Sequence, residues 1–373
     1  MSHAATAYGA IGAWVYVEPS LSPLTKAMLS VLTEFGDLFA LGTFMLVAGF
    51  LTPTSLVRKG SARFVGDRLL RLGAPVLLTV LVVTPLVVWM IVAATGYPLT
   101  LAAYVSYQLG WLDPVQMWFP AVLLIFTLCY AAWRRMRPAS GSRSEALRMR
   151  HLIVAAVLIA GLTFVIRLGF PVGSQQPLEL HLWQWPQLAV LFAVGVVARE
   201  RGWLEASPSR LIRRVSWLAV VVTVPVLFAI VAVSGSDVTS GSGMSAYSGG
   251  WHWQAALAAG AEGVVSVAGT LTVIELFRRF ATWSGRLPRT LGRDSYMAFF
   301  LQLPVLVALE LALRPLAWPG EVKLGLTAPA AIAICFTTAW AIRRARGAAA
   351  GRPWRTTGSK PGPRRLLPHS HVG

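Results

Sequence analysis

Long apolar stretches alternate with short polar ones along almost the whole chain. A helix needs about 20 apolar residues to cross a bilayer; eight stretches approach or exceed that length, and a ninth is shorter. We predict membrane spans at residues 26–51, 72–95, 114–133, 152–170, 186–198, 215–234, 254–276, 295–313 and 324–342. The stretch 186–198 is short, and we expect flanking tryptophans to complete it. The pattern therefore predicts an all-α polytopic bundle of membrane helices.

The first 19 residues form a weaker apolar segment that ends in an aromatic cluster with Trp14 and Tyr16. The segment is too short to span a bilayer alone, and it lacks the basic start of a signal peptide. We expect it to be the outer half of a helix that begins before Met1. The complete fold would then have nine full spans and this partial first one, ten in all.

The positive charge is concentrated in alternate loops. The formal net charge is +18, and 29 of the 33 Lys and Arg residues fall in residues 52–71, 133–151, 199–214, 277–293 and the tail from 343. Basic loops of membrane proteins face the cytoplasm, so we predict a multi-pass protein of the cell membrane with a cytoplasmic C-terminus. This explanation of the charge requires no nucleic-acid partner.

Composition supports the same class. Hydrophobic residues make up 55% of the chain, charged residues 13%, and the mean hydropathy is +0.62, which excludes an ordinary soluble domain. We predict a membrane domain over residues 1–346 and a disordered basic tail over 347–373. Cys129 and Cys335 lie inside apolar stretches and are typical of small core residues, and no spacing of ligands indicates a metal site. No phosphate-binding loop or hydrolase motif is present.

Several ionisable residues fall within or beside the predicted spans. Such groups cost several kcal/mol at membrane depth and usually have a partner or a function. Each could belong to an interhelical pair, and one such pair could join Asp37 to one of the arginines. The set comprises Glu34, Asp37, Arg68, Arg71, Arg167, Glu262, Glu275 and Glu310.

Arg68 and Arg71 stand out because they are three residues apart where the chain returns into the membrane. Three residues make almost one helical turn, so we expect both guanidinium groups to face the same way. A pair of permanently charged forks suits a phosphate or a carboxylate. The alternative is that both are ordinary anchors at the inner face of the membrane.

Histidine is the natural general base at neutral pH, and the chain has six. Those in the tail and in the basic loop at 151 are poor candidates, which leaves His3, His181 and His252. His181 and His252 lie in outer loops beside tryptophans, where a histidine often only hydrogen-bonds at the interface. His3 would lie inside the first helix, where an unpaired imidazole is harder to explain structurally.

The sequence resembles the integral-membrane acyltransferase 3 family, near the branch of the glucan biosynthesis protein C type. The most specific block contains Phe44-Met-Leu-Val-Ala-Gly49-Phe50, Arg58-Lys59-Gly60 and Arg68-Leu-Leu-Arg71-Leu-Gly-Ala-Pro75. The segment from His3 to Trp14 is similar to the end of that branch's first helix. Weaker similarity continues at Met117-Trp118-Phe119, at 186–204 and at 295–305.

The resemblance implies about ten membrane helices and transfer of an acyl group, such as acetyl or succinyl, from an acyl-CoA-type donor. The acceptor would be a hydroxyl of a carbohydrate or of another envelope or secondary-metabolite compound. By the same resemblance His3 is the catalytic base and Arg68 and Arg71 bind the donor. We add Asp37, Trp118 and Gln302 as possible supporting residues. Acyl-CoA would be a co-substrate, with no bound cofactor and no metal.

Two features depart from the family pattern. The family's first-helix arginine would precede Met1, and the histidine that often occurs in the ninth helix is replaced by Gln302. We expect a longer natural chain; the alternative is a truncated copy with impaired activity. Two other functions remain open, a non-enzymatic membrane carrier or flippase and a degenerate, structural or regulatory family member.

Overall fold

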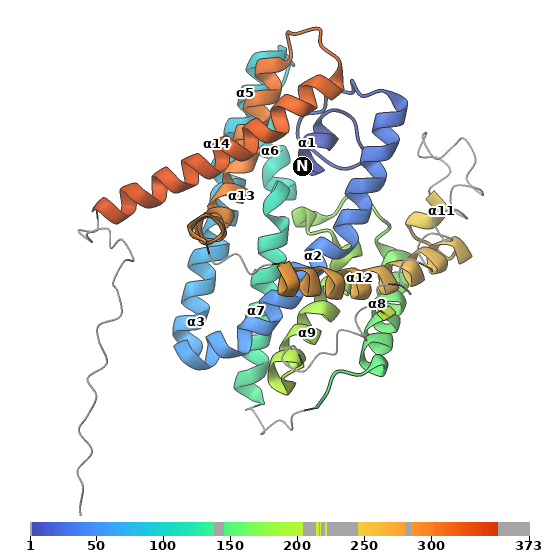
Figure 1. Cartoon of the computed structure of the whole chain (residues 1–373). Coiled ribbons are helices and arrows are strands. Elements are labelled where there is room, and N and C mark those ends of the chain that lie inside the picture. Colours follow the sequence, from blue (N-terminus) through green and yellow to red (C-terminus); the bar gives the residue numbers. More distant parts are fainter. Residues whose placement is uncertain are drawn as a thin grey trace, which may run out of the picture.

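The computed structural model describes residues 2–137, 145–203, 214–215, 217, 221, 245–280 and 285–349. All regular elements of these residues are helical, as expected (Figure 1). The long helices are α2 (Pro23–Lys59), α7 (Trp118–Met136), α8 (Met149–Gly169), α9 (Trp185–Arg201), α12 (Trp253–Phe280), α13 (Arg286–Leu313) and α14 (Gly320–Ala349).

The remaining elements are shorter. A helix that follows α2 is built from α3 (Ser61–Arg68), η1 (Leu69–Gly73), α4 (Ala74–Leu78), η2 (Thr79–Val83) and α5 (Thr84–Thr95). The other short elements are α1 (Ser2–Ala7), α6 (Leu101–Trp111), η3 (Val115–Met117), η4 (Pro177–Glu179), η5 (Leu182–Gln184) and α11 (Ser245–Ser248).

Seven helical stretches of the described residues are long and apolar enough to cross a membrane: Phe39–Lys59, Ser61–Thr95, Val115–Met136, Met149–Gly169, Trp253–Arg279, Pro288–Leu313 and Gly320–Ala348. Each coincides with one of the nine predicted spans. The predicted span 186–198 corresponds to α9, whose 17 residues are fewer than a typical span needs. The predicted span 215–234 lies almost wholly outside the described residues. The predicted disordered tail was 347–373, but α14 continues through residues 347–349, so its start is corrected; residues 350–373 lie outside the described residues. The chain is thus a multi-pass membrane protein, and the total of nine or ten spans stays a prediction.

Two prolines shape the helix that returns after α2. The π-helical turns η1 and η2 directly precede the turns that contain Pro75 and Pro85. Proline has no N–H and its ring clashes with the preceding turn, so a regular α-helical ladder cannot continue there. A local π turn absorbs that disruption while the helix carries on. Arg71 lies within the first of these turns.

Close backbone contact holds α2 against α9. A Cβ added at Gly49 would collide with the Phe192 carbonyl, and one added at Gly195 would collide with the Leu46 carbonyl. Small residues allow membrane helices to approach this closely because no side chain separates the backbones. These glycines therefore have a packing role, and they fix the helix that leads to the arginine hairpin.

The helices α13 and α14 form an antiparallel pair that also anchors the N-terminal segment. At one end, Arg343 binds both carboxylate oxygens of Asp294 at 2.6 and 3.0 Å. Near the other end, the Tyr8 hydroxyl lies 2.8 Å from the Thr327 hydroxyl, and Lys323 contacts Glu18 at 2.5 Å. The N-terminal residues are thus fixed against α14.

Candidate functional site

His3 lies in α1 and faces the middle of α13. Its Nδ1 atom is 2.7 Å from the side-chain nitrogen of Gln302, and its ring lies 4.8 Å from the Trp14 ring, measured between centroids. The two residues that the sequence marked as catalytic and as supporting therefore contact each other across 299 positions of the chain.

The contact with Gln302 constrains the protonation of the imidazole. When the amide N–H of Gln302 donates to Nδ1, the neutral ring carries its proton on Nε2. When the amide is turned over, its oxygen accepts a hydrogen bond from the Nδ1–H group, and Nε2 becomes the free base. Gln302 can therefore hold either neutral tautomer, and the orientation of its amide decides which nitrogen can take a proton.

Trp14 also contacts a buried carboxylate. The Trp14 indole N–H lies 3.2 Å from each oxygen of Glu310, and Glu310 is only 1% exposed. Among the described residues no ion pair involves Glu310. Trp14 thus contacts both the candidate base and a buried carboxylate.

Arg68 is partly buried, and its guanidinium lies over an aromatic ring of the same helix. Its guanidinium carbon lies 5.1 Å from the centre of the Phe64 ring, and its Nε atom is buried without a hydrogen-bond partner. A guanidinium has five N–H donors, so this side chain retains capacity to bind an anion.

Arg71 has different surroundings. Its side chain is 72% exposed, and its Nε atom lies 2.7 Å from Asp67, which also binds Lys59 at 2.7 Å. The two arginines therefore differ in exposure and in partners, and the π-helical turn η1 begins between them. Among the described residues no ion pair joins Asp37 to Arg68, Arg71 or any other arginine, so the expected pair with Asp37 is not found.

Trp118 belongs to a different cluster from His3. Its ring lies 4.4 Å from His181, and His181 stacks on Trp183 with centroids 4.7 Å apart. Trp118 also packs in the buried core with Phe64 and Val122. No described contact links it to His3, so the structure gives Trp118 a packing partner rather than a place beside the candidate base.

Acid should destabilise the loop that contains His181. Burial lowers the pKa of His181 to about 4 from its ordinary 6.5. The unfolded chain therefore takes up this proton more readily, so the folded state loses stability as pH falls from 6.5 to 4, by at most about 3 kcal/mol. Asparagine tolerates the left-handed backbone at φ 52°. His181→Asn should therefore make the melting temperature depend less on pH over this range. An equal pH slope in the variant and in the unaltered protein would contradict this assignment.

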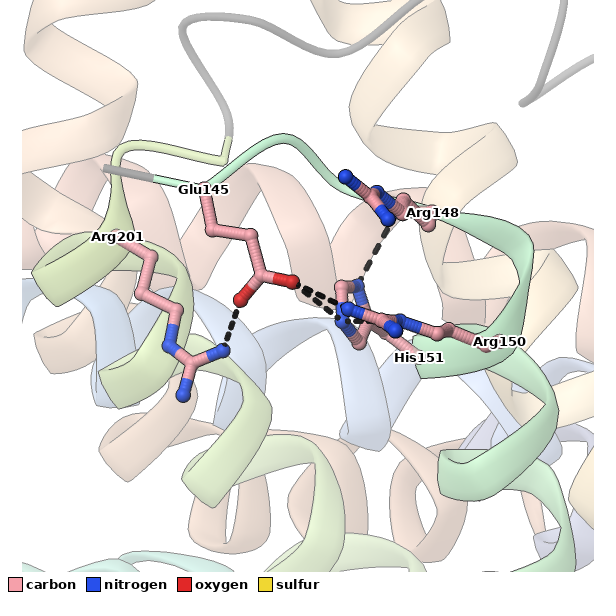
Figure 2. Close-up of polar contacts among 5 residues, drawn as sticks. All are labelled: Glu145, Arg148, Arg150, His151 and Arg201. Carbon is pink, nitrogen blue, oxygen red and sulfur yellow. Dashed lines mark hydrogen bonds and ion pairs between the residues drawn. The ribbon is translucent and has the colours of Figure 1, made fainter. Parts of the chain in front are cut away.

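Glu145, in the segment before α8, contacts several cations, and sequence reasoning did not predict this cluster. Figure 2 shows Glu145 between Arg201 on one side and Arg150 and His151 on the other. The Arg150 contact is 2.7 Å and the His151 contact is 3.3 Å. His151 also stacks on Trp203, with ring centroids 4.7 Å apart. The charge rule for loops predicted the arginines, but it gives no means of pairing them with one acid.

The remaining sequence candidates have structural surroundings. Arg167 and Glu262 form an ion pair of 2.7 Å between α8 and α12, and Glu275 pairs with Arg278 and Arg279 on its own helix. His252 is exposed in the turn before α12. The side chain of Glu34 is outside the described part of the structure.

A family model described as "Acyltransferase domain", acyltransferase 3, matches residues 1–344. No curated protein and no solved structure matches the chain.

Proposed function

Because this chain belongs to the acyltransferase 3 family, we propose that it moves an acyl group from an acyl-CoA-type thioester to an acceptor hydroxyl. The acceptor is a carbohydrate or another envelope or secondary-metabolite compound. Within the proposal, the basic loops and the C-terminus face the cytoplasm, and the protein resides in the cell membrane. The observation that carries the site is the contact between His3 and Gln302 within the matched residues.

The proposed reaction uses His3 as general base. Nε2 of the imidazole takes the proton of the acceptor hydroxyl as its oxygen attacks the thioester carbonyl carbon. The tetrahedral oxyanion then collapses, the carbon–sulfur bond breaks, and the thiolate leaves and takes a proton from the imidazolium. This sequence requires Gln302 to present its oxygen to Nδ1, because only then is Nε2 free to accept a proton.

Arg68 and Arg71 are proposed to bind the donor. A CoA donor carries several phosphate charges, and arginine binds phosphate through paired N–H bonds. The unpaired Nε of Arg68 and the exposure of Arg71 support this role. Lys59 and Asp67 can orient Arg71, since Asp67 binds both cations.

The experiment that tests the function measures thiol release from acetyl-CoA by the purified protein in lipid vesicles. We expect release to increase when a cell-envelope extract is added as the source of acceptors, and to stop when the acyl donor is replaced by CoA. A carrier or flippase would instead move extract components across the vesicle without any acyl donor. Donor-independent movement without thiol release would therefore contradict the proposal.

Loss of either arginine should weaken donor binding. A hydrogen bond to a charged group contributes about 1.5–3 kcal/mol, so Arg68→Gln and Arg71→Gln should each raise the KM for acetyl-CoA about 10- to 100-fold. The exposed Arg63, in the same hairpin, provides the matched control Arg63→Gln, which should change KM less than about threefold. Unchanged KM and unchanged turnover in Arg71→Gln would remove Arg71 from the donor site.

A further inference from the structure

A cavity lies between α13 and α14, beside the candidate base. Its volume is about 210 Å³, and its walls are mostly small or aliphatic side chains. The residues that shape it are Ala298, Leu306, Ala331, Ile332 and Cys335. Ala298, Ala331 and Cys335 are themselves buried, so the free space follows from the small size of these side chains.

The cavity reaches His3 through two neighbours. Gln302, which contacts the imidazole, is one of the lining residues, and so is Ala4, the residue after His3. Along α13 the lining runs from Ser295 to Leu306. These two residues are 11 positions apart, which corresponds to about 16 Å of helix at 1.5 Å per residue. The space is thus elongated along the helices, and Gln302 lies part of the way along it.

The size and polarity of the cavity suit a short hydrocarbon. An apolar cavity of about 150 Å³ in another protein stays dry and binds benzene, so this larger space can hold a group of at least about six carbons. The lining has a polar group of its own at Gln302 and another at Ser295. The Ser295 hydroxyl already donates to the Leu291 carbonyl at 2.6 Å.

We propose that this cavity holds the hydrocarbon part of the donor's acyl group and sets the chain length that the protein transfers. The inference rests on the proposed acyl transfer. A thioester whose acyl chain lies along α13 has its carbonyl carbon near Gln302 and His3. The buried side chains of Ala298, Ala331 and Cys335 form the walls that limit how much of an acyl chain fits.

Filling the cavity should shorten the accepted chain. Ala331→Leu adds bulk at a buried lining position, and one methylene in an apolar pocket is worth about a 10- to 200-fold change in kcat/KM. We expect at least a tenfold loss with butyryl-CoA and hexanoyl-CoA, while acetyl-CoA keeps its rate within about threefold. Ala333→Leu is the matched control, because Ala333 is exposed on the same helix and does not line the cavity.

Enlarging the cavity gives an independent test that does not rely on a buried substitution. Ile332 is 48% exposed and lines the cavity, whereas Ile334 is 40% exposed and does not. Ile332→Ala should raise the relative kcat/KM for octanoyl-CoA about tenfold or more, and Ile334→Ala should leave the profile unchanged. Folding of every variant is checked by its melting temperature in detergent.

The outcomes separate this inference from the proposed function. If the unaltered protein transfers no acyl group from any donor, the proposed function fails. If it transfers acyl groups but Ala331→Leu and Ile332→Ala keep its chain-length profile, the cavity does not hold the acyl group. If the cavity instead holds a chain of a membrane lipid, the substitutions should change the rates with all acyl donors equally. That result would also overturn the inference.

Discussion

Replacing His3 with alanine should lower the acyl-transfer rate about 10²- to 10⁴-fold, the usual contribution of a positioned general base. The rate should fall because no other described histidine contacts Gln302, and an amide cannot take a proton at neutral pH. The KM for acetyl-CoA should change little, since His3 is assigned to the acceptor hydroxyl. Thiol release and KM are measured together in the vesicle assay.

The control for this substitution is His252→Ala, which removes an exposed histidine before α12. We expect its rate to stay within about threefold of the unaltered protein, as for other surface replacements that contact no reactant. If both variants lost activity equally, the loss in His3→Ala would not be specific to the candidate base. Full activity in His3→Ala would assign the base to another residue.

Breaking the pair of Arg167 and Glu262 should produce the largest loss of stability. Their side chains are 9% and 5% exposed, and the guanidinium lies 2.7 Å from the carboxylate. Removal of one partner leaves an uncompensated buried charge, which costs about 3–5 kcal/mol. Glu262→Ala should therefore lower the free energy of unfolding by that amount, measured by denaturation in mixed micelles.

Two variants make this prediction specific. The double replacement Arg167→Met with Glu262→Leu should recover most of the loss, because neither charge remains buried. Glu275→Ala removes a carboxylate of the same helix whose partners Arg278 and Arg279 are substantially exposed, so it should cost less than about 1 kcal/mol. If Glu262→Ala were as stable as Glu275→Ala, the buried pair would not hold α8 to α12.

The spans could be predicted from sequence because each one requires a run of apolar residues, whatever its neighbours. Helix packing could not be predicted in the same way. Gly49 and Gly195 are needed because the backbones of α2 and α9 meet, and a single sequence does not say which helices meet. The π turns before Pro75 and Pro85 illustrate the same limit, since proline marks a disruption without fixing how the helix absorbs it.

The candidate site was predictable in its residue types but not in its contacts. His3 was selected because an imidazole in an apolar helix is costly, and Gln302 was selected by resemblance to the family. The two residues are 299 positions apart in the sequence, and no local sequence pattern predicts a contact between residues so far apart. The same applies to Arg71, whose nearest acid is Asp67 in the preceding turn rather than Asp37.

The most direct test of the account follows the acyl group itself. The full chain in vesicles is incubated with acetyl-CoA that carries an isotopic label in the acetyl group, together with a cell-envelope extract, and the products are analysed by mass spectrometry. We predict that a hydroxyl-bearing component gains one labelled acetyl group with the unaltered protein and gains at most about 1% as much with His3→Ala. Labelled acetyl that appears on no component, or equally with both proteins, would contradict acyl transfer by His3.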